Sequence, residues 1–309
     1  MQVLHTAAGC GDLPLTLFFL DKGANLHLKD GYGETPLYCA IKNRSIKIAN
    51  VLLERGANIN DGADDGVTPL SLSCANGDNE MVVFLLDSGA NPMTPDIRGI
   101  TPFFTACAQG HVRIVNILLE MNREIPGIVD INKTTNNDIT PFYAACQRGC
   151  LEIVKILVEM DVERDKPNLQ AITPFHAAVE RGELEVAQYL ISLGSDPYTV
   201  NTTDTTCLHT AAKFGRLEMF QYLEELDLDI DKTDQYGATP LDVAKSFGHG
   251  NMVSYLLGKN ALEGSDYLRD PKSRAKSTYM KMMLGRGGGD ELLKQNSKPT
   301  GMIENGEIF

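Results

Sequence analysis

Thr35-Pro36-Leu37-Tyr38-Cys39-Ala40 is one copy of a short segment that recurs along most of this 309-residue chain. A threonine, a proline and a hydrophobic residue stand together again at Thr68-Pro69-Leu70, Thr101-Pro102-Phe103, Thr140-Pro141-Phe142, Thr173-Pro174-Phe175 and Thr239-Pro240-Leu241. Thr206-Cys207-Leu208-His209 fills the gap in the series, and the intervals between copies are 33, 33, 39, 33, 33 and 33 residues. Gln2 stands 33 residues before Thr35 and is followed by Val3-Leu4-His5, so the spacing predicts eight units.

A second marker keeps the same phase. Units end in a turn of the Gly-Ala-Asn type, at Gly23-Ala24-Asn25, Gly56-Ala57-Asn58, Gly89-Ala90-Asn91 and Gly194-Ser195-Asp196. Glycine here tolerates the left-handed conformation that ends many helices. Two markers in one phase make an accidental repeat implausible.

The residue types within a unit predict two helices and a turn. Proline is tolerated at the first position of a helix, and the preceding threonine can cap that helix with its hydroxyl. A mid-unit glycine such as Gly110 ends the first helix, and apolar residues at helical spacing, such as Ile114, Val115 and Leu118, predict a second one. The polar stretch Asp30-Gly31-Tyr32-Gly33 at the unit boundary predicts a β-turn finger.

This pattern resembles the ankyrin repeat, which has a 33-residue unit and a T-P-L-H-x-A core. The resemblance covers residues 1–262 and implies an all-α fold, a solenoid of stacked helix-turn-helix units with β-turn fingers. For residues 263–309 we expect a C-terminal helix, from Ser265 to Leu284, and a flexible tail. A short linear motif for a partner is the alternative for this region.

Two units depart from the pattern. The fourth is six residues too long, and we expect an enlarged loop near 122–127 at the edge of the stack; a partner contact or a kink in the stack are the alternatives. The first lacks its finger and has apolar residues such as Leu15 and Phe18 where a terminal repeat should be polar. We therefore expect missing upstream sequence, against the alternative of a stack that begins here.

Charge and composition narrow the class of partner. The net charge of the chain is −13. The first 260 residues carry −14, and the remaining residues carry +1. Nucleic acid and anionic membrane both require a cationic surface on the protein that binds them. We therefore expect a protein partner that is basic or of mixed charge. We expect the chain itself to be a monomer. No apolar run reaches the roughly 18–20 residues that cross a bilayer. Seven cysteines without close pairing favour a reducing compartment, the cytoplasm or the nucleus.

Catalytic and metal-binding groupings are not evident in the sequence. Cys74, Cys107 and Cys146 share one repeat position, so they should lie roughly 8–10 Å apart, too far for one zinc ion with bonds of about 2.3 Å. His5, His176 and His209 share the fourth motif position, where the resemblance implies a structural hydrogen bond between helix starts and fingers. No phosphate-binding glycine motif is present. We expect no metal, no cofactor and no enzymatic activity.

The resemblance implies that partners bind to the fingers and to the exposed side of the first helices, on the concave face. Transferred by repeat position, the candidate partner-binding residues are Tyr32, Glu34, Asp64, Asp65, Arg98, Arg148, Arg181, Lys213, Phe214, Tyr236 and Phe247. Phe214 and Phe247 lie 33 residues apart at a position that is usually polar, and aromatic residues dominate interface hot spots. We expect them to anchor the partner, or else to pack beneath neighbouring fingers.

Asn60 lies in a Gly-Ala-Asn-Ile-Asn turn with Leu52 eight residues upstream, which resembles sites of asparagine hydroxylation in ankyrin proteins. An ordinary turn-stabilising asparagine is the alternative. For the whole chain the resemblance implies a protein–protein interaction module, a scaffold or adaptor. The alternative is a regulatory ankyrin fragment of a larger channel or multi-domain enzyme.

Overall fold

The computed structural model describes residues 3–160 and 162–264, which form sixteen helices. The first helices of the eight units are α1 (Val3–Gly9), α3 (Pro36–Lys42), α5 (Pro69–Ala75), α7 (Pro102–Gln109), α9 (Pro141–Arg148), α11 (Pro174–Arg181), α13 (Cys207–Lys213) and α15 (Pro240–Phe247). The second helices are α2 (Leu13–Asp21), α4 (Ile46–Glu54), α6 (Asn79–Asp87), α8 (Val112–Glu124), α10 (Leu151–Glu159), α12 (Leu184–Ser192), α14 (Leu217–Glu224) and α16 (Gly250–Gly258). The helix expected from Ser265 to Leu284 lies outside the described residues.

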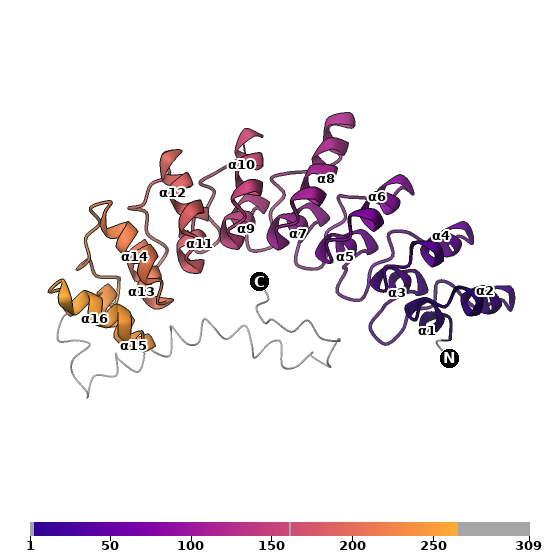
Figure 1. The fold of residues 1–309 in the computed structure, drawn as a ribbon, viewed down its shortest axis with the longest axis horizontal. Helices are drawn as coiled ribbons and strands as arrows, with labels where there is room; N and C mark the ends of the chain where they lie inside the picture. Colours follow the sequence, from indigo (N-terminus) through magenta and orange to yellow (C-terminus); the bar gives the residue numbers. More distant parts are fainter. Residues whose placement is uncertain (1–2, 161, 265–309) are drawn as a thin grey trace.

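The helix pairs stack side by side into an arc (Figure 1). The first helix of each pair lies on the inside of the arc and the second on the outside, so we call them the inner and outer helices. Each inner helix packs against its own outer helix and against the inner helices of adjacent units. The all-α solenoid expected from the 33-residue phase is therefore confirmed.

Threonine caps start seven of the eight inner helices. In each case the threonine side chain accepts a hydrogen bond from the backbone N–H three residues later, at Thr35, Thr68, Thr101, Thr140, Thr173, Thr206 and Thr239. Proline follows directly in six of them, where its missing N–H leaves no bond unmade. The recurring Thr-Pro pair thus sets where each inner helix begins.

Replacing one cap should weaken the stack measurably. Thr140→Ala removes the hydroxyl that accepts the Tyr143 N–H at 3.0 Å, and we expect the free energy of unfolding to fall by about 1 kcal/mol. Urea denaturation followed by circular dichroism measures this. Thr202→Ala, an exposed change in a finger, is the matched control and should stay within about 0.5 kcal/mol of wild type. Equal effects for the two variants would contradict the capping role.

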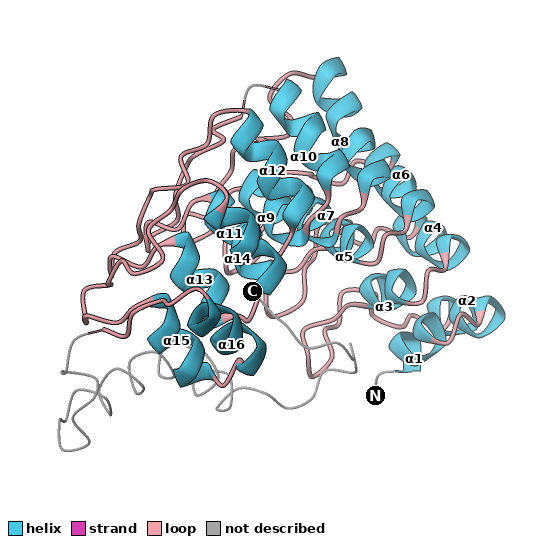
Figure 2. Ribbon diagram, turned by 60° about the vertical axis from the view of Figure 1, so that its left-hand side comes forward, coloured by secondary structure: helices cyan, strands magenta, loops and turns pink. Residues whose placement is uncertain are grey.

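The fingers project to one side of the helices, where the loops gather in Figure 2. Each finger from the second unit onward closes with a backbone bond of the type Gly33 N–H to Asp30 O and ends in a residue with positive φ. Consecutive fingers are also joined to each other: Asp64 N–H donates to Tyr32 O at 3.1 Å, and the same bond recurs at Ile97, Asn136, Leu169, Thr202 and Gln235. The expected β-turn fingers are present and form a hydrogen-bonded row.

A side-chain acceptor holds most of these turns. Asp30 Oδ1 accepts both the Tyr32 and the Glu34 N–H, and Asp96, Asn168, Asn201 and Asp234 accept the matching pair in their own fingers. Such local bonds favour turns over regular structure. In the third unit Ala63 takes this position, and Asp65 instead accepts the Val67 N–H. The fingers therefore have defined shapes suited to presenting side chains.

One continuous apolar core runs through the stack between inner and outer helices. Its largest fully buried side chains include Phe103, Phe142, Phe175 and Phe220. Buried alanines such as Ala106 and Ala145 bring neighbouring helices close together. No unit buries its own apolar face alone, so the units stabilise one another.

The extra residues of the fourth unit are not only a loop. Met121, Asn122, Arg123 and Glu124 extend α8, which has 13 residues where α6 has 9. Ile125 then takes an extended conformation, as expected before Pro126, and Asn122 Oδ1 accepts the Gly127 and Val129 N–H groups. The expected enlarged loop is thus corrected: the insertion begins as helix because its first residues favour helix, and the proline ends it.

At the first unit, the apolar residues noted in the sequence are exposed on α2, where Phe18 is 54% and Leu15 39% accessible. Phe18 packs edge-on against Phe19 and lies under the Lys22 ammonium. Among the described helices, none combines the length and the apolar character needed to span a membrane.

Candidate protein-binding surface

Charge is divided unevenly between the two helix layers. The inner helices contain five lysines and arginines against two acidic residues, a net charge of +3. The outer helices contain four basic and eleven acidic residues, a net charge of −7. The acidity of the body therefore lies on the outer helices and in the loops. On the concave face the inner helices are cationic and the fingers, which are loops, are acidic.

Most of the candidate finger residues are on the surface. Tyr32, Asp64, Asp65 and Arg98 are exposed, and Tyr236 is half-buried against the core. Arg98 is held in place, because its Nε and Nη2 both donate to Asp96 Oδ2, at 2.9 and 2.8 Å. Asp96 is itself buried beneath the finger. The guanidinium is therefore fixed at the finger tip and half exposed.

Glu34 was expected to face a partner, and this expectation is wrong. It is only 8% exposed, and its carboxylate points back toward α3. Glu34 Oε1 pairs with Lys42 Nζ at 2.9 Å, and the Cys39 thiol donates to Oε2 at 3.8 Å. The residue just before the capping threonine faces the inner helix, so Glu34 joins the finger to that helix.

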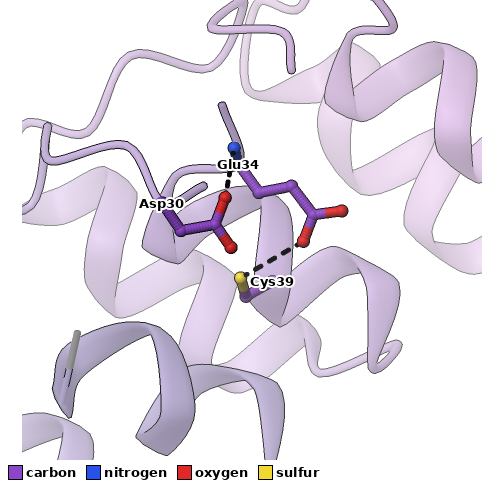
Figure 3. A group of neighbouring side chains, drawn as sticks. All are labelled: Asp30, Glu34 and Cys39. Atoms are coloured by element: carbon purple, nitrogen blue, oxygen red, sulfur yellow. Dashed lines mark hydrogen bonds between the residues drawn. The ribbon is translucent and has the colours of Figure 1, made fainter. Parts of the chain in front are cut away.

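Asp30, Glu34 and Cys39 bring their ligand-type atoms within 4.8 Å of one another (Figure 3). Each atom already has a structural role, since Asp30 Oδ1 accepts two backbone N–H groups and Glu34 binds Lys42. Burial, and then the nearby Glu34 and Asp30 carboxylates, raise the pKa of the Cys39 thiol to about 12. A thiol that keeps its proton at neutral pH is a weak metal ligand. The cluster fits a hydrogen-bonded brace between finger and helix.

The cysteine ladder and the motif histidines are built into the core. Cys74, Cys107 and Cys146 are fully buried, and burial raises the pKa of each thiol. His209 Nε2 donates to Ala238 O in the next finger at 2.9 Å, and His5 Nε2 lies 2.7 Å from Leu28 O. Burial lowers the pKa of both His176 and His209 to about 4. His5 and His209 thus tie their units to the next finger.

Phe214 and Phe247 sit at the ends of two successive inner helices. Phe214 is 36% exposed, whereas Phe247 is half-buried and packs against the core. The Lys213 ammonium lies over both rings, 5.1 Å from the Phe214 centroid and 5.8 Å from that of Phe247. Of the two expected roles, packing and partner anchoring, Phe247 has mainly the first. Phe214, together with Lys213, presents an aromatic and cationic surface that suits the second.

The equivalent positions of the second to sixth units extend this pair into a row along the inside of the arc. From N- to C-terminus the row reads Asn43, Asn76, Gln109, Arg148, Arg181, Phe214 and Phe247, so it changes from polar to cationic to aromatic. Arg148 is exposed and Arg181 is half-buried. Burial raises the pKa of nearby Glu180, and Arg181, Lys213 and Arg216 act in the opposite direction. The C-terminal half of the row offers the cations and rings that are common at interface hot spots.

Asn60 has a structural role in its turn. It is half-buried, its N–H donates to Asn58 Oδ1 at 3.1 Å, and its Oδ1 accepts the Asn91 N–H of the next unit at 2.9 Å. Leu52 is fully buried in α4. Through these two hydrogen bonds Asn60 stabilises its own turn and joins it to the turn of the next unit.

The candidate list missed a hollow between the fourth and fifth fingers. A pocket of about 260 Å³ is lined by Arg98, Ile100, Phe104, Thr135, Asn136, Asn137 and Ile139. Repeat position predicts Arg98, Asn136 and Asn137 at finger tips, but not the apolar part of the lining. The available signal was Phe104, which occupies the place of the histidine in the T-P-L-H core.

The comparisons with known proteins agree with this geometry. Models of ankyrin repeats (3 copies) match residues 1–63, 59–126, 123–201 and 175–267. A search of curated proteins gave no significant match. Among solved structures, the chain is similar to the human ASB11 ankyrin repeat domain, with 28% identity and a TM-score of 0.62 over 73% of this chain and 97% of that one. The chain belongs to the ankyrin-repeat family.

Proposed function

We propose that this protein is a scaffold or adaptor that binds a partner protein on the concave face formed by its fingers and inner helices. Ankyrin repeats mediate protein–protein interaction and typically serve as binding modules without catalytic activity. The observation that carries the proposal is the row at the inner-helix ends, which places exposed Arg148 and Phe214 along one face. Variable side chains on a repeated frame suit recognition.

The electrostatics of this face favour a basic or mixed-charge partner, because its fingers carry more negative charge than its inner helices carry positive charge. The fingers hold eight acidic residues and Arg98, a net charge of −7, against +3 on the inner helices. The cations at the C-terminal half of the row suit carboxylates of a mixed-charge partner. We further propose that the protein works in the cytoplasm or the nucleus, which is supported by seven free thiols.

The proposal can be tested by affinity purification with quantitative mass spectrometry. Phe214→Ala combined with Phe247→Ala should reduce recovery of the partner by about tenfold, because both rings and the cation–π contacts of Lys213 are lost. Val83→Ala with Leu257→Ala, exposed changes on the outer helices α6 and α16, is the matched control and should not alter recovery.

The melting temperature separates binding from packing. Unchanged recovery of every partner with the double phenylalanine variant would contradict the proposed anchor. A large fall in melting temperature without loss of binding would assign both rings to packing. Loss of binding with the outer-helix control instead would place the binding surface on the convex side.

We also propose that Asn60 is a hydroxylation site, on the resemblance of its turn to modified ankyrin turns. Mass spectrometry of the peptide containing Asn60, taken from the native source, should show the mass increase of one oxygen atom. Asn58→Gln tests whether the neighbouring turn is needed, because Asn58 holds the Asn60 N–H. An unmodified peptide at full coverage would leave Asn60 as a turn residue only.

A further inference from the structure

The fourth residue of the Thr-Pro-Leu-His segment, three residues after the capping threonine, faces the next finger. His209 uses this position to donate to Ala238 O, and His5 reaches the Glu34 carbonyl at 3.1 Å. Glu34, Ile139 and Ala238 occupy the same place in their respective fingers. In the fourth unit the position is Phe104, which has no polar atom and cannot make this bond.

An apolar contact takes the place of the hydrogen bond. Phe104, Ala108 and Ala144 form a hydrophobic cluster separate from the main core, with Ile100 and Ile139 packed against it. Phe104 is 2% exposed, and the two isoleucines are half-buried. The inner face between α7 and α9 is therefore apolar where neighbouring units are polar.

The pocket lies on top of this cluster. Phe104, Ile100 and Ile139 contribute its apolar lining, and Arg98, Asn136 and Asn137 contribute polar groups from two finger tips. Its volume, about 260 Å³, is below the roughly 300–1,000 Å³ typical of cofactor and drug-sized sites. The space suits a single bulky apolar side chain.

The surroundings of the pocket favour a protein segment with a carboxylate beside that side chain. Arg98 is the charged residue of the lining, fixed by Asp96 and half exposed, and no acidic residue is part of the lining. Asn137 uses its backbone N–H and C=O within the finger row, while its carboxamide has no hydrogen-bond partner among the described residues. Ile97 and Leu169, on the adjacent finger tips, are 68% and 62% exposed. Exposed apolar groups around a cation are typical of a recognition site.

We propose that this pocket, which we call the Phe104 pocket, binds one bulky apolar side chain of an extended partner segment, with a neighbouring Asp or Glu of that segment on Arg98. The proposal rests on the proposed function and specifies the chemistry of the partner. The apolar side chain gains burial on Phe104, Ile100 and Ile139. The planar guanidinium offers donors to a carboxylate, and Asn137 can pair with the segment's backbone.

The test uses the whole chain and synthetic peptides of defined composition. An array of Ser/Gly-based peptides carries a central Leu, Met or Phe next to one Asp or Glu; matched peptides carry Ser at the centre, or Gln or Lys in place of the acid. The tightest peptide is labelled and titrated by fluorescence anisotropy. We expect the apolar–acidic peptides to bind, and the Ser-centred and Lys-containing peptides to bind at least about tenfold more weakly.

Two variants with a matched control connect binding to the pocket. Phe104→His restores the histidine found at this position in other units, so it keeps a fold-compatible contact with Ile139 and removes the apolar floor. It should weaken peptide binding about tenfold, while Tyr143→His, which places histidine at the equivalent position one unit later, should not. Arg98→Gln should abolish the preference for the Glu peptide over its Gln analogue. Circular dichroism melts confirm that each variant is folded.

The outcomes separate this inference from the proposed function. Equal binding of Ser-centred peptides, a preference for Lys peptides, or unchanged binding with Phe104→His would overturn the pocket proposal. If a partner protein were still captured on the inner-helix row in that case, the proposed function would stand without the Phe104 pocket. If the peptide bound to the Phe104 pocket but no partner protein bound to the concave face, the proposed function would be contradicted, and with it the pocket as a site for a partner segment.

Discussion

Phe142→Ala should lower the free energy of unfolding by about 3–5 kcal/mol, the largest effect that we expect from a single substitution in this chain. The Phe142 ring is fully buried at the start of α9, in the middle of the stack. Its removal leaves a cavity between units that depend on one another for their core. Since each unit contacts only its neighbours, the loss should also divide the unfolding transition into two.

Urea denaturation followed by circular dichroism tests this expectation. Ile97→Ala, which shortens an exposed side chain on the fourth finger, is the control and should change stability by no more than about 0.5 kcal/mol. A change below about 1 kcal/mol for Phe142→Ala would contradict a continuous core through the fifth unit.

Acid should destabilise the stack strongly between pH 6.5 and pH 4. Burial lowers the pKa of His176 and His209 from 6.5 to about 4 in the folded chain. The unfolded chain therefore binds more protons in this range, and the stability that neutral histidines contribute above pH 6.5 is lost as the pH falls toward 4. Each histidine accounts for roughly 3 kcal/mol of this loss.

A single variant separates the histidines from the acidic groups that also titrate here. Burial raises the pKa of Glu180 and Asp234, so these carboxyls oppose the histidine effect as the pH falls. His209→Gln keeps a donor for Ala238 O but does not titrate, so its stability should fall less steeply from pH 7 to pH 4.5 than that of wild type. His27→Gln changes an exposed histidine and serves as the control. Parallel curves for His209→Gln and wild type would refute the account.

The fold was predictable because its signals are local. Thr140 caps the helix that begins at Pro141, and Gly149 ends that helix with a φ of 76°. These residue types act on the local backbone, so they have the same effect in other units. Periodicity then placed the core residues of the outer helices. The extension of α8 was less predictable, because residues 122–124 can continue a helix or form a loop, and only Pro126 fixes the end.

The binding surface was predictable only in outline, since it depends on how units pack together. Glu34 belongs to a finger by position, yet the backbone turns its carboxylate toward Lys42 and away from solvent. Net charge could not reveal that acidic residues gather on the outer helices. Phe104 differs from the usual histidine in the sequence, but the resulting pocket requires Ile139 from the next finger.

Site-specific photo-crosslinking tests the central claim, that the concave face binds a partner protein, most directly. A photoreactive amino acid is placed at Gln109, exposed at the end of inner helix α7, or at Asn116, exposed on outer helix α8 of the same unit. Both chains are then irradiated in cell extract under identical conditions. The account predicts a crosslinked partner protein at Gln109 and none at Asn116. Crosslinking at Asn116 with none at Gln109 would contradict it.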